Sequence, residues 1–154
     1  MKAVEIMVSA LPTISRKASI KEAVLMMKTN IGNEDFLNSA PNLIVVNENG
    51  DLAGILTPLT LISALIDTTE NKKIPIPKTP GVFNSLSKNI MNMLVEDIME
   101  RQPISITEDA LLPDVSELFV QHKFQMIPVV KDKKVVGIVY HAPLLFYMAD
   151  SFFN

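Results

Sequence analysis

The sequence of 154 residues contains no cysteine, only two histidines and only five glycines. Without cysteine the chain has no disulfide framework, no thiol nucleophile and no thiolate metal site. The two histidines, His122 and His141, have no carboxylate at metal-ligand spacing, so we expect no metal site. The glycines form neither a Walker loop nor a dinucleotide-binding loop, which excludes these phosphate-binding motifs.

Long apolar runs and a dense cluster of one charge are also missing. No apolar run approaches the roughly 18 residues that span a bilayer, and residues 1–11 lack the features of a targeting signal. We therefore expect a cytoplasmic protein that binds no membrane. The net charge is −3. The one close group of lysines, Lys131, Lys133 and Lys134, is typical of a solvated hairpin turn, so we expect no nucleic-acid binding.

The sequence also shows no group of titratable residues arranged for acid–base catalysis. Glu96 with Asp97, and Glu108 with Asp109, are adjacent carboxylate pairs at expected starts of elements, where favourable interaction with a helix N-terminus explains them. Neither pair has a histidine nearby in the sequence. Because acid–base and nucleophilic catalysis both need a positioned titratable group, we expect the protein not to be an enzyme.

The sequence does contain an internal repeat. Residues 44–56 align without a gap on residues 127–139, an offset of 83 residues (137 minus 54). In each copy an apolar run, a polar stretch and a second apolar run predict two strands joined by a tight turn. Asn49 and Gly50 form a pair that favours such a turn.

A strand and a helix precede each hairpin, and a second helix follows it. Ser19 and Glu22 predict a capping box, and Thr57 predicts an N-cap before Pro58. The order β-α-β-β-α therefore occurs twice, which predicts an α/β (α+β) fold. The expected strands cover 12–15 and 103–106, and the expected helices cover 20–28, 58–67, 111–123 and about 142–150.

The two copies differ in length. Their first helices align at an offset of 92 residues (115 minus 23) and their hairpins at 83, so the first copy carries nine extra residues, which we expect as a loop at 30–40. Prolines at 67–87 predict a linker, and residues 86–99 predict a helix. We expect a first repeat at 1–68, a linker at 69–90 and a second repeat at 91–154.

Several short motifs point to a known family. The second copy contains Asp-Ile-Met at 97–99, Pro-Ile-Ser-Ile at 103–106, Met-Ile-Pro-Val-Val at 126–130 and Gly-Ile-Val at 137–139, and the first contains Gly-Ile-Leu-Thr at 54–57. With these motifs the chain resembles a tandem pair of CBS domains, the arrangement called a Bateman module. The resemblance implies repeats packed sheet to sheet with pseudo-twofold symmetry, clefts between them that bind adenosine-containing nucleotides, and a homodimer.

The resemblance also implies ligand-binding positions. In nucleotide-binding members a Thr or Ser follows Gly-apolar-apolar, and an Asp three residues later binds the ribose. The first copy has Thr57 and Thr60 there, and the second has Tyr140 and Pro143, so both lack the carboxylate. Thr57 is also sufficient as a helix cap alone. Tyr140 either fills the cleft with its own ring or stacks on a base, and His141 either meets a phosphate or lies at the surface.

Six further residues match the strand that walls the adenine pocket in that family, although apolar strand residues are more often simply core. These are Asn42, Leu43, Ile44, Met126, Ile127 and Pro128. The expected function is a non-catalytic regulatory sensor that requires no cofactor, binds AMP, ADP, ATP or S-adenosylmethionine, and acts on an unknown protein partner. The alternative is a structural dimerisation module that has lost nucleotide binding.

Overall fold

The computed structural model describes residues 1–9, 11–30, 41–70 and 87–153. Residues 31–40 of the predicted loop and residues 71–86 of the predicted linker lie outside the described residues. The first repeat has the predicted order of elements. It consists of β1 (Thr13–Ser15), α1 (Ile20–Asn30), β2 (Leu43–Val46), β3 (Leu52–Leu56) and α2 (Pro58–Glu70).

Short-range hydrogen bonds explain where these elements begin and turn. Ser19 Oγ accepts a hydrogen bond from the Glu22 backbone N–H at 3.1 Å, as expected of a residue that caps α1. At the hairpin turn the Asn47 side chain accepts from two backbone N–H groups. Gly50 follows with a φ of 80°, in the left-handed region that glycine favours. The predicted helix start and hairpin turn are confirmed.

The second repeat departs from its predicted order at the first strand. It consists of α4 (Val95–Ile98), β4 (Glu100–Arg101), α5 (Leu112–His122), β5 (Met126–Lys131), β6 (Lys134–Tyr140) and α6 (His141–Phe153). The strand predicted at 103–106 is wrong, because only a single bridge joins Ile106 to Val129. The segment that leads into the second repeat instead forms a strand a few residues earlier. This strand is β4, and it pairs with β3 of the first repeat.

The continuous helix predicted at 86–99 is also wrong. Residues 87–91 are helical, and α4 starts only at Val95. Between them the Ile20 N–H donates to the Met93 carbonyl at 2.9 Å, and the Val95 N–H donates to the Ala18 carbonyl at 2.8 Å. These bonds tie the segment to the first residue of α1 and to the chain just before it. They use backbone groups that a continuous helix would pair internally.

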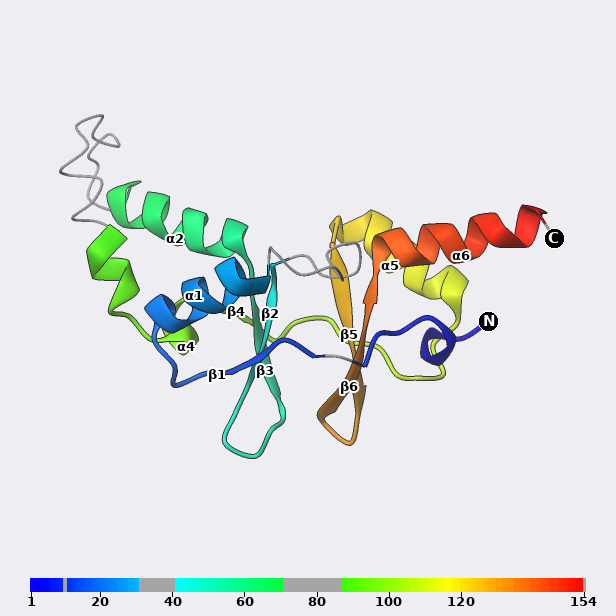
Figure 1. Cartoon of the computed structure of the whole chain (residues 1–154), viewed down its shortest axis with the longest axis horizontal. Coiled ribbons are helices and arrows are strands. Elements are labelled where there is room, and N and C mark those ends of the chain that lie inside the picture. Colours follow the sequence, from blue (N-terminus) through cyan, green and yellow to red (C-terminus); the bar gives the residue numbers. More distant parts are fainter. Residues whose placement is uncertain (10, 31–40, 71–86, 154) are drawn as a thin grey trace.

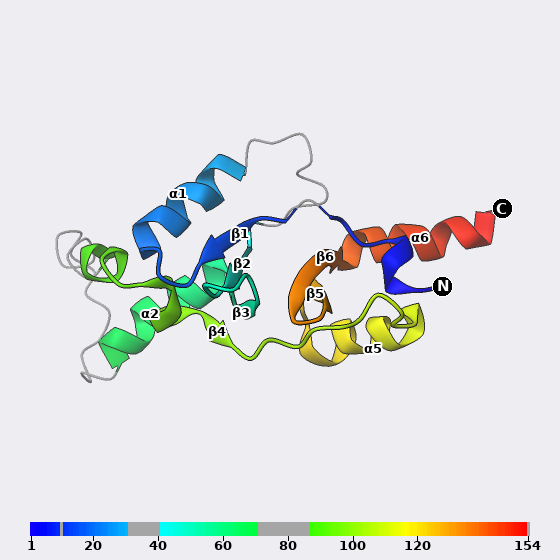
Figure 2. The same ribbon diagram turned by 90° about the horizontal axis from the view of Figure 1, so that it is seen from below.

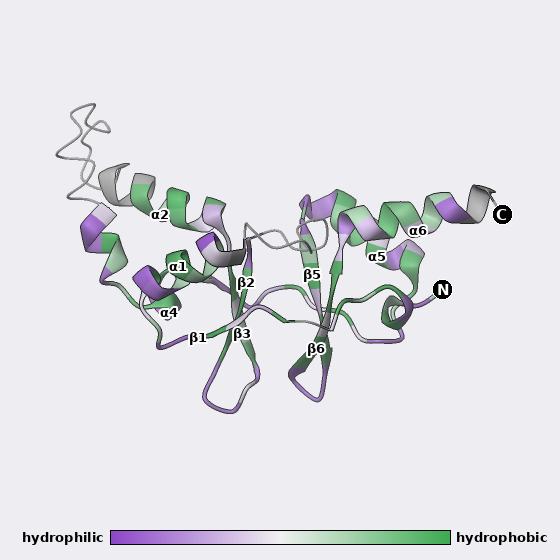
Figure 3. Ribbon diagram, viewed as in Figure 1, coloured by the Kyte–Doolittle hydropathy of each residue, from purple (hydrophilic) through white to green (hydrophobic). Residues whose placement is uncertain are grey.

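The strands form two sheets that face each other. Strands β1 to β4 make one sheet in that order, and β5 pairs with β6 in the other. Figure 1 shows the two hairpins side by side with their turns at one edge, while α2 and α6 leave from the opposite edge. The hairpin turns are hydrophilic, and the strands above them are largely hydrophobic (Figure 3). This is the predicted α/β fold of two related repeats packed sheet to sheet.

A buried cluster joins the two hairpins, and each repeat has a further core under its helices. The joining cluster draws Ile44 and Ile55 from the first hairpin and Met126, Ile138 and Tyr140 from the second. At the turns Lys134 Nζ pairs with Asp51 Oδ1 at 2.7 Å, which adds a link between the hairpins. Among the described residues, no helix has the length and apolarity needed to cross a membrane.

The two repeats exchange their leading segments, which sequence analysis did not predict. The helix η1 (Ala3–Glu5) contacts the second repeat, where the Ala3 N–H donates to the Ala110 carbonyl at 2.8 Å. Val8 then forms a bridge with Ile138 of β6. In return, β4 completes the sheet of the first repeat. Both crossings are visible in Figure 2, and each repeat is completed by a segment of the other.

Candidate functional site

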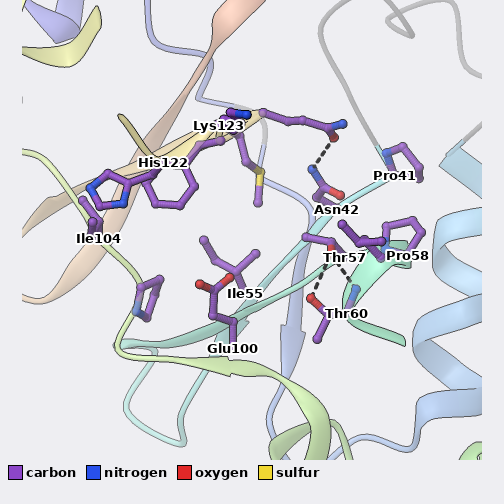
Figure 4. Close-up of a pocket in the computed structure, with 15 residues that line it drawn as sticks. Pro41, Asn42, Ile55, Thr57, Pro58, Thr60, Glu100, Ile104, His122 and Lys123 are labelled. Carbon is purple, nitrogen blue, oxygen red and sulfur yellow. Dashed lines mark hydrogen bonds between the residues drawn. The ribbon is translucent and has the colours of Figure 1, made fainter. Parts of the chain in front are cut away.

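A cavity of about 520 Å³ lies between the repeats (Figure 4). Its volume falls within the range of about 300 to 1,000 Å³ that is typical of small-molecule sites. The start of α2 forms one wall, the end of α5 and the entry to β5 form another, and the segment after α4 closes a third side. The lining residues are Pro41, Asn42, Ile55, Thr57, Pro58, Leu59, Thr60, Glu100, Pro103, Ile104, His122, Lys123, Phe124, Gln125 and Met126.

Two threonines at the start of α2 bring hydroxyl groups to the cavity. Thr57 Oγ1 accepts a hydrogen bond from the Thr60 N–H at 3.0 Å, so the predicted N-cap is confirmed. The two hydroxyl oxygens also lie 2.9 Å apart, within hydrogen-bond distance of each other. Because one hydroxyl donates to the other, the pair keeps one hydroxyl proton and free lone pairs for a further partner.

A pair of amides bridges the repeats at the cavity wall. Asn42 is only 2% exposed, and its Nδ2 donates to Gln125 Oε1 at 3.4 Å. The two residues are 83 positions apart, which is the offset of the internal repeat. Asn42 is one of the predicted ligand-binding residues, whereas Gln125 is not. The signal for Gln125 was nevertheless present, since it is the residue that aligns with Asn42.

Charged and aromatic side chains complete the lining, and sequence analysis missed them. His122 stacks on Phe124 with ring centroids 4.9 Å apart and an angle of 11° between the rings. Lys123 ends α5 in the left-handed conformation, with a φ of 54°. Glu100 comes from β4, and its carboxylate points into the cavity (Figure 4). No local pattern reveals these residues, because the chain fold alone places them opposite Thr57.

The ten predicted ligand-binding residues separate into two groups. Four of them line the cavity, namely Asn42, Thr57, Thr60 and Met126. Leu43, Ile44 and Ile127 are fully buried core residues, and Pro128 is also buried. His141 is exposed at the start of α6, with its ring edge-on to Phe119 at 6.2 Å. Which of the ten contact a ligand stays a prediction.

Tyr140 occupies the position in the second repeat that corresponds to Thr57. Its side chain is 6% exposed and packs in the cluster that joins the hairpins. Burial raises the pKa of the Tyr140 hydroxyl, because the charged form loses hydration. Whether this ring fills the cleft or stacks on a base stays a prediction.

The carboxylate pair before β4 has a structural role. Asp97 Oδ2 accepts a hydrogen bond from the Leu94 N–H at 3.1 Å and so caps α4. Glu96 forms an ion pair with Lys17 at 2.8 Å. Neither residue lines the cavity. Among the described residues, no group of three histidine, aspartate or glutamate side chains is arranged to hold a metal ion.

Comparison with protein families gives a match over most of the chain. The model of the CBS domain family matches residues 3–67 and 95–142. The uncharacterized protein MJ1404 of Methanocaldococcus jannaschii is 29% identical over 153 residues, which is 97% of this chain and 32% of that protein. The chain therefore spans about a third of the length of this relative. CBSX1, a chloroplastic CBS domain-containing protein of Arabidopsis thaliana, is 29% identical over 62% of this chain and 44% of its own length.

Solved structures show the same fold. CBSX2 from Arabidopsis thaliana, described as a CBS-pair protein, superposes with a TM-score of 0.75 at 19% identity and covers 99% of this chain and 97% of that one. A crystal structure of CBSX2 in complex with AMP superposes with a TM-score of 0.72 over 98% of both chains, also at 19% identity.

Proposed function

Because the chain belongs to the CBS domain family, as a tandem pair of repeats, we propose that it is a regulatory module that binds an adenosine-containing nucleotide between the repeats. The cavity is the observation that carries this proposal, since both repeats contribute to its walls. The AMP complex of CBSX2 supports the choice of ligand, because that protein has the same fold.

A ligand in this cavity would act on the packing of the repeats. Thr57 and Thr60 come from one repeat, and Lys123 and Gln125 come from the other. A ligand that contacts both sets has a different affinity for each relative position of the repeats. It therefore shifts the population between those positions, and a protein partner senses the shift.

The proposal assigns ligand contact to the predicted residues that line the cavity. The hydroxyls of Thr57 and Thr60 meet polar groups of the ligand, and Asn42 and Met126 contact the base. The remaining predicted residues make no ligand contact in this proposal, because they lie outside the cavity lining.

Thr60→Ala tests the site without removing the helix cap, because the cap uses the Thr60 backbone N–H and the Thr57 hydroxyl. We expect AMP, ADP, ATP or S-adenosylmethionine to raise the melting temperature of the wild type, since a ligand at 100 times its Kd adds about 2.7 kcal/mol. The dissociation constant, measured by titration calorimetry, should rise about fivefold in the variant through loss of a hydrogen bond.

The matched control is Thr29→Ala on α1, where the hydroxyl donates to the Leu25 carbonyl at 2.9 Å. Thr29 is absent from the cavity lining, so this variant should bind like the wild type. If none of the four ligands shifts the melting temperature of the wild type, the nucleotide-binding proposal is wrong.

A second candidate function is a dimerisation module without a ligand. Apolar side chains on α2 and α6 favour it, since Leu59, Ile62, Leu145 and Phe146 are each more than half exposed. Both helices carry long hydrophobic stretches in Figure 3. Burial of these side chains between two copies would form a homodimer in either proposal. A dimer in sedimentation analysis, together with no response to nucleotides, would support this second function.

A further inference from the structure

The charges that line the cavity are unevenly distributed. Among the described residues of the lining, Glu100 is the one carboxylate and Lys123 the one lysine, with His122 beside it. Glu100 lies on the edge strand β4, whereas Lys123 ends α5 on another wall. A ligand in the cavity therefore meets a negative group on one side and a positive group on the other.

Strand pairing holds Glu100 toward the cavity. Glu100 pairs with Ile55 of β3, and residues opposite each other in an antiparallel pair present their side chains on the same face. Ile55 lines the cavity, so Glu100 faces it too. The neighbouring Gly54 permits this close approach, because a Cβ there would lie 2.7 Å from the Glu100 carbonyl oxygen. Figure 4 shows the carboxylate among the lining side chains.

The Glu100 carboxylate has no protein partner within the described part of the chain. The guanidinium of the adjacent Arg101 points elsewhere, since its Nη2 donates to the Glu96 carbonyl at 3.0 Å, and it forms no ion pair with Glu100 among the described residues. Glu100 is exposed, so water satisfies its carboxylate while the cavity is open. A ligand that displaces this water must offer hydrogen-bond donors, because a carboxylate that loses its partners is strongly destabilised.

We propose that Glu100 selects the ligand by its charge, an inference that rests on the proposed function. The ligand presents hydroxyl donors, such as those of a ribose, to Glu100 and a single phosphate to Lys123. A nucleoside monophosphate satisfies both ends of the cavity. The further phosphates of a triphosphate add negative charge to a cavity that already holds the Glu100 carboxylate, without a second lysine in the described lining to balance it. The site is therefore selective for AMP over ATP.

Titration calorimetry of the wild type and of Glu100→Gln with AMP, ATP and 2′,3′-dideoxy-AMP tests this proposal. Glutamine keeps the shape and an acceptor but removes the charge. We expect the wild type to bind AMP about tenfold more tightly than ATP, and the variant to lose most of this preference. The loss of affinity on removal of the ribose hydroxyls should also be several-fold smaller in the variant.

Two further variants separate charge from structure. Glu117→Gln on α5 removes an exposed carboxylate that does not line the cavity, and it should keep the wild-type preference. Glu100→Asp keeps the charge and should keep most of the preference for AMP. If Glu100→Asp loses the preference as fully as Glu100→Gln does, selection by charge is overturned.

The same titrations distinguish the failure of this inference from the failure of the proposed function. If the wild type and Glu100→Gln bind AMP and ATP with the same ratio of affinities, Glu100 does not select the ligand, while nucleotide binding stands. If the wild type binds none of the three nucleotides, the proposed function fails and the inference fails with it.

Discussion

At the scale of single residues, Thr57 combines a local and a long-range role. Its hydroxyl accepts the Thr60 N–H and so begins α2, and the same side chain lines the cavity. The cap was predictable, because it depends on residues three positions apart in the sequence. Glu100 was not predictable in the same way, since its place in the cavity depends on the pairing of β4 with β3.

The cap gives a prediction for stability. Thr57→Ala should lower the free energy of unfolding by about 1 kcal/mol, because the first turn of α2 loses a hydrogen-bond acceptor. Thr57→Ser keeps that acceptor and should retain most of the wild-type stability. Urea denaturation followed by circular dichroism measures both variants. Equal stability of Thr57→Ala and the wild type would show that the capping bond is energetically unimportant.

At the scale of elements, two glycines let the exchanged segments approach the hairpins. A Cβ on Gly54 would lie 2.6 Å from Met99 Sδ and 2.7 Å from the Glu100 carbonyl oxygen. A Cβ on Gly137 would lie 2.5 Å from Met7 Sδ, and its nearest contacts are all to that side chain. The two sites are related by the internal repeat. They differ in whether the obstacle is backbone or a flexible side chain.

This difference predicts unequal costs for the same substitution. Gly54→Ala should lower the free energy of unfolding by about 1 to 3 kcal/mol, since the β4 backbone must move away. Gly137→Ala should cost less, because methionine adapts its shape. Met7→Ala should relieve the cost of Gly137→Ala, whereas Met99→Ala should not relieve that of Gly54→Ala. Denaturation of the single and double variants measures these differences, and equal costs at both glycines would contradict the explanation.

At the scale of the whole molecule, the two repeats share a fold but present different residues to the space between them. Thr57 and Thr60 line the cavity, whereas Tyr140 and Pro143 occupy the corresponding positions of the second repeat. The Tyr140 ring is buried in the cluster that joins the hairpins. The pseudo-twofold symmetry of the backbone therefore does not extend to the binding positions.

Under the proposed function, this asymmetry predicts one nucleotide per chain. Titration calorimetry with AMP should give a stoichiometry near one, because Tyr140 fills the space that a second ligand would need. Tyr140→Phe keeps the ring and should leave the stoichiometry unchanged. A stoichiometry of two in the wild type would show that Tyr140 moves aside or stacks on a second ligand.

The sequence alone determined the repeat, the first-repeat elements, the Asn49 and Gly50 turn and the Thr57 cap. Each of these depends on hydrogen bonds or periodicity within a few residues, and such patterns can be recognised in the sequence. The tertiary structure decided the exchange of the leading segments, the break before α4 and the residues that face Thr57 across the cavity. These features arise where backbone groups distant in sequence compete for the same hydrogen bonds. Only the folded chain determines which of them meet.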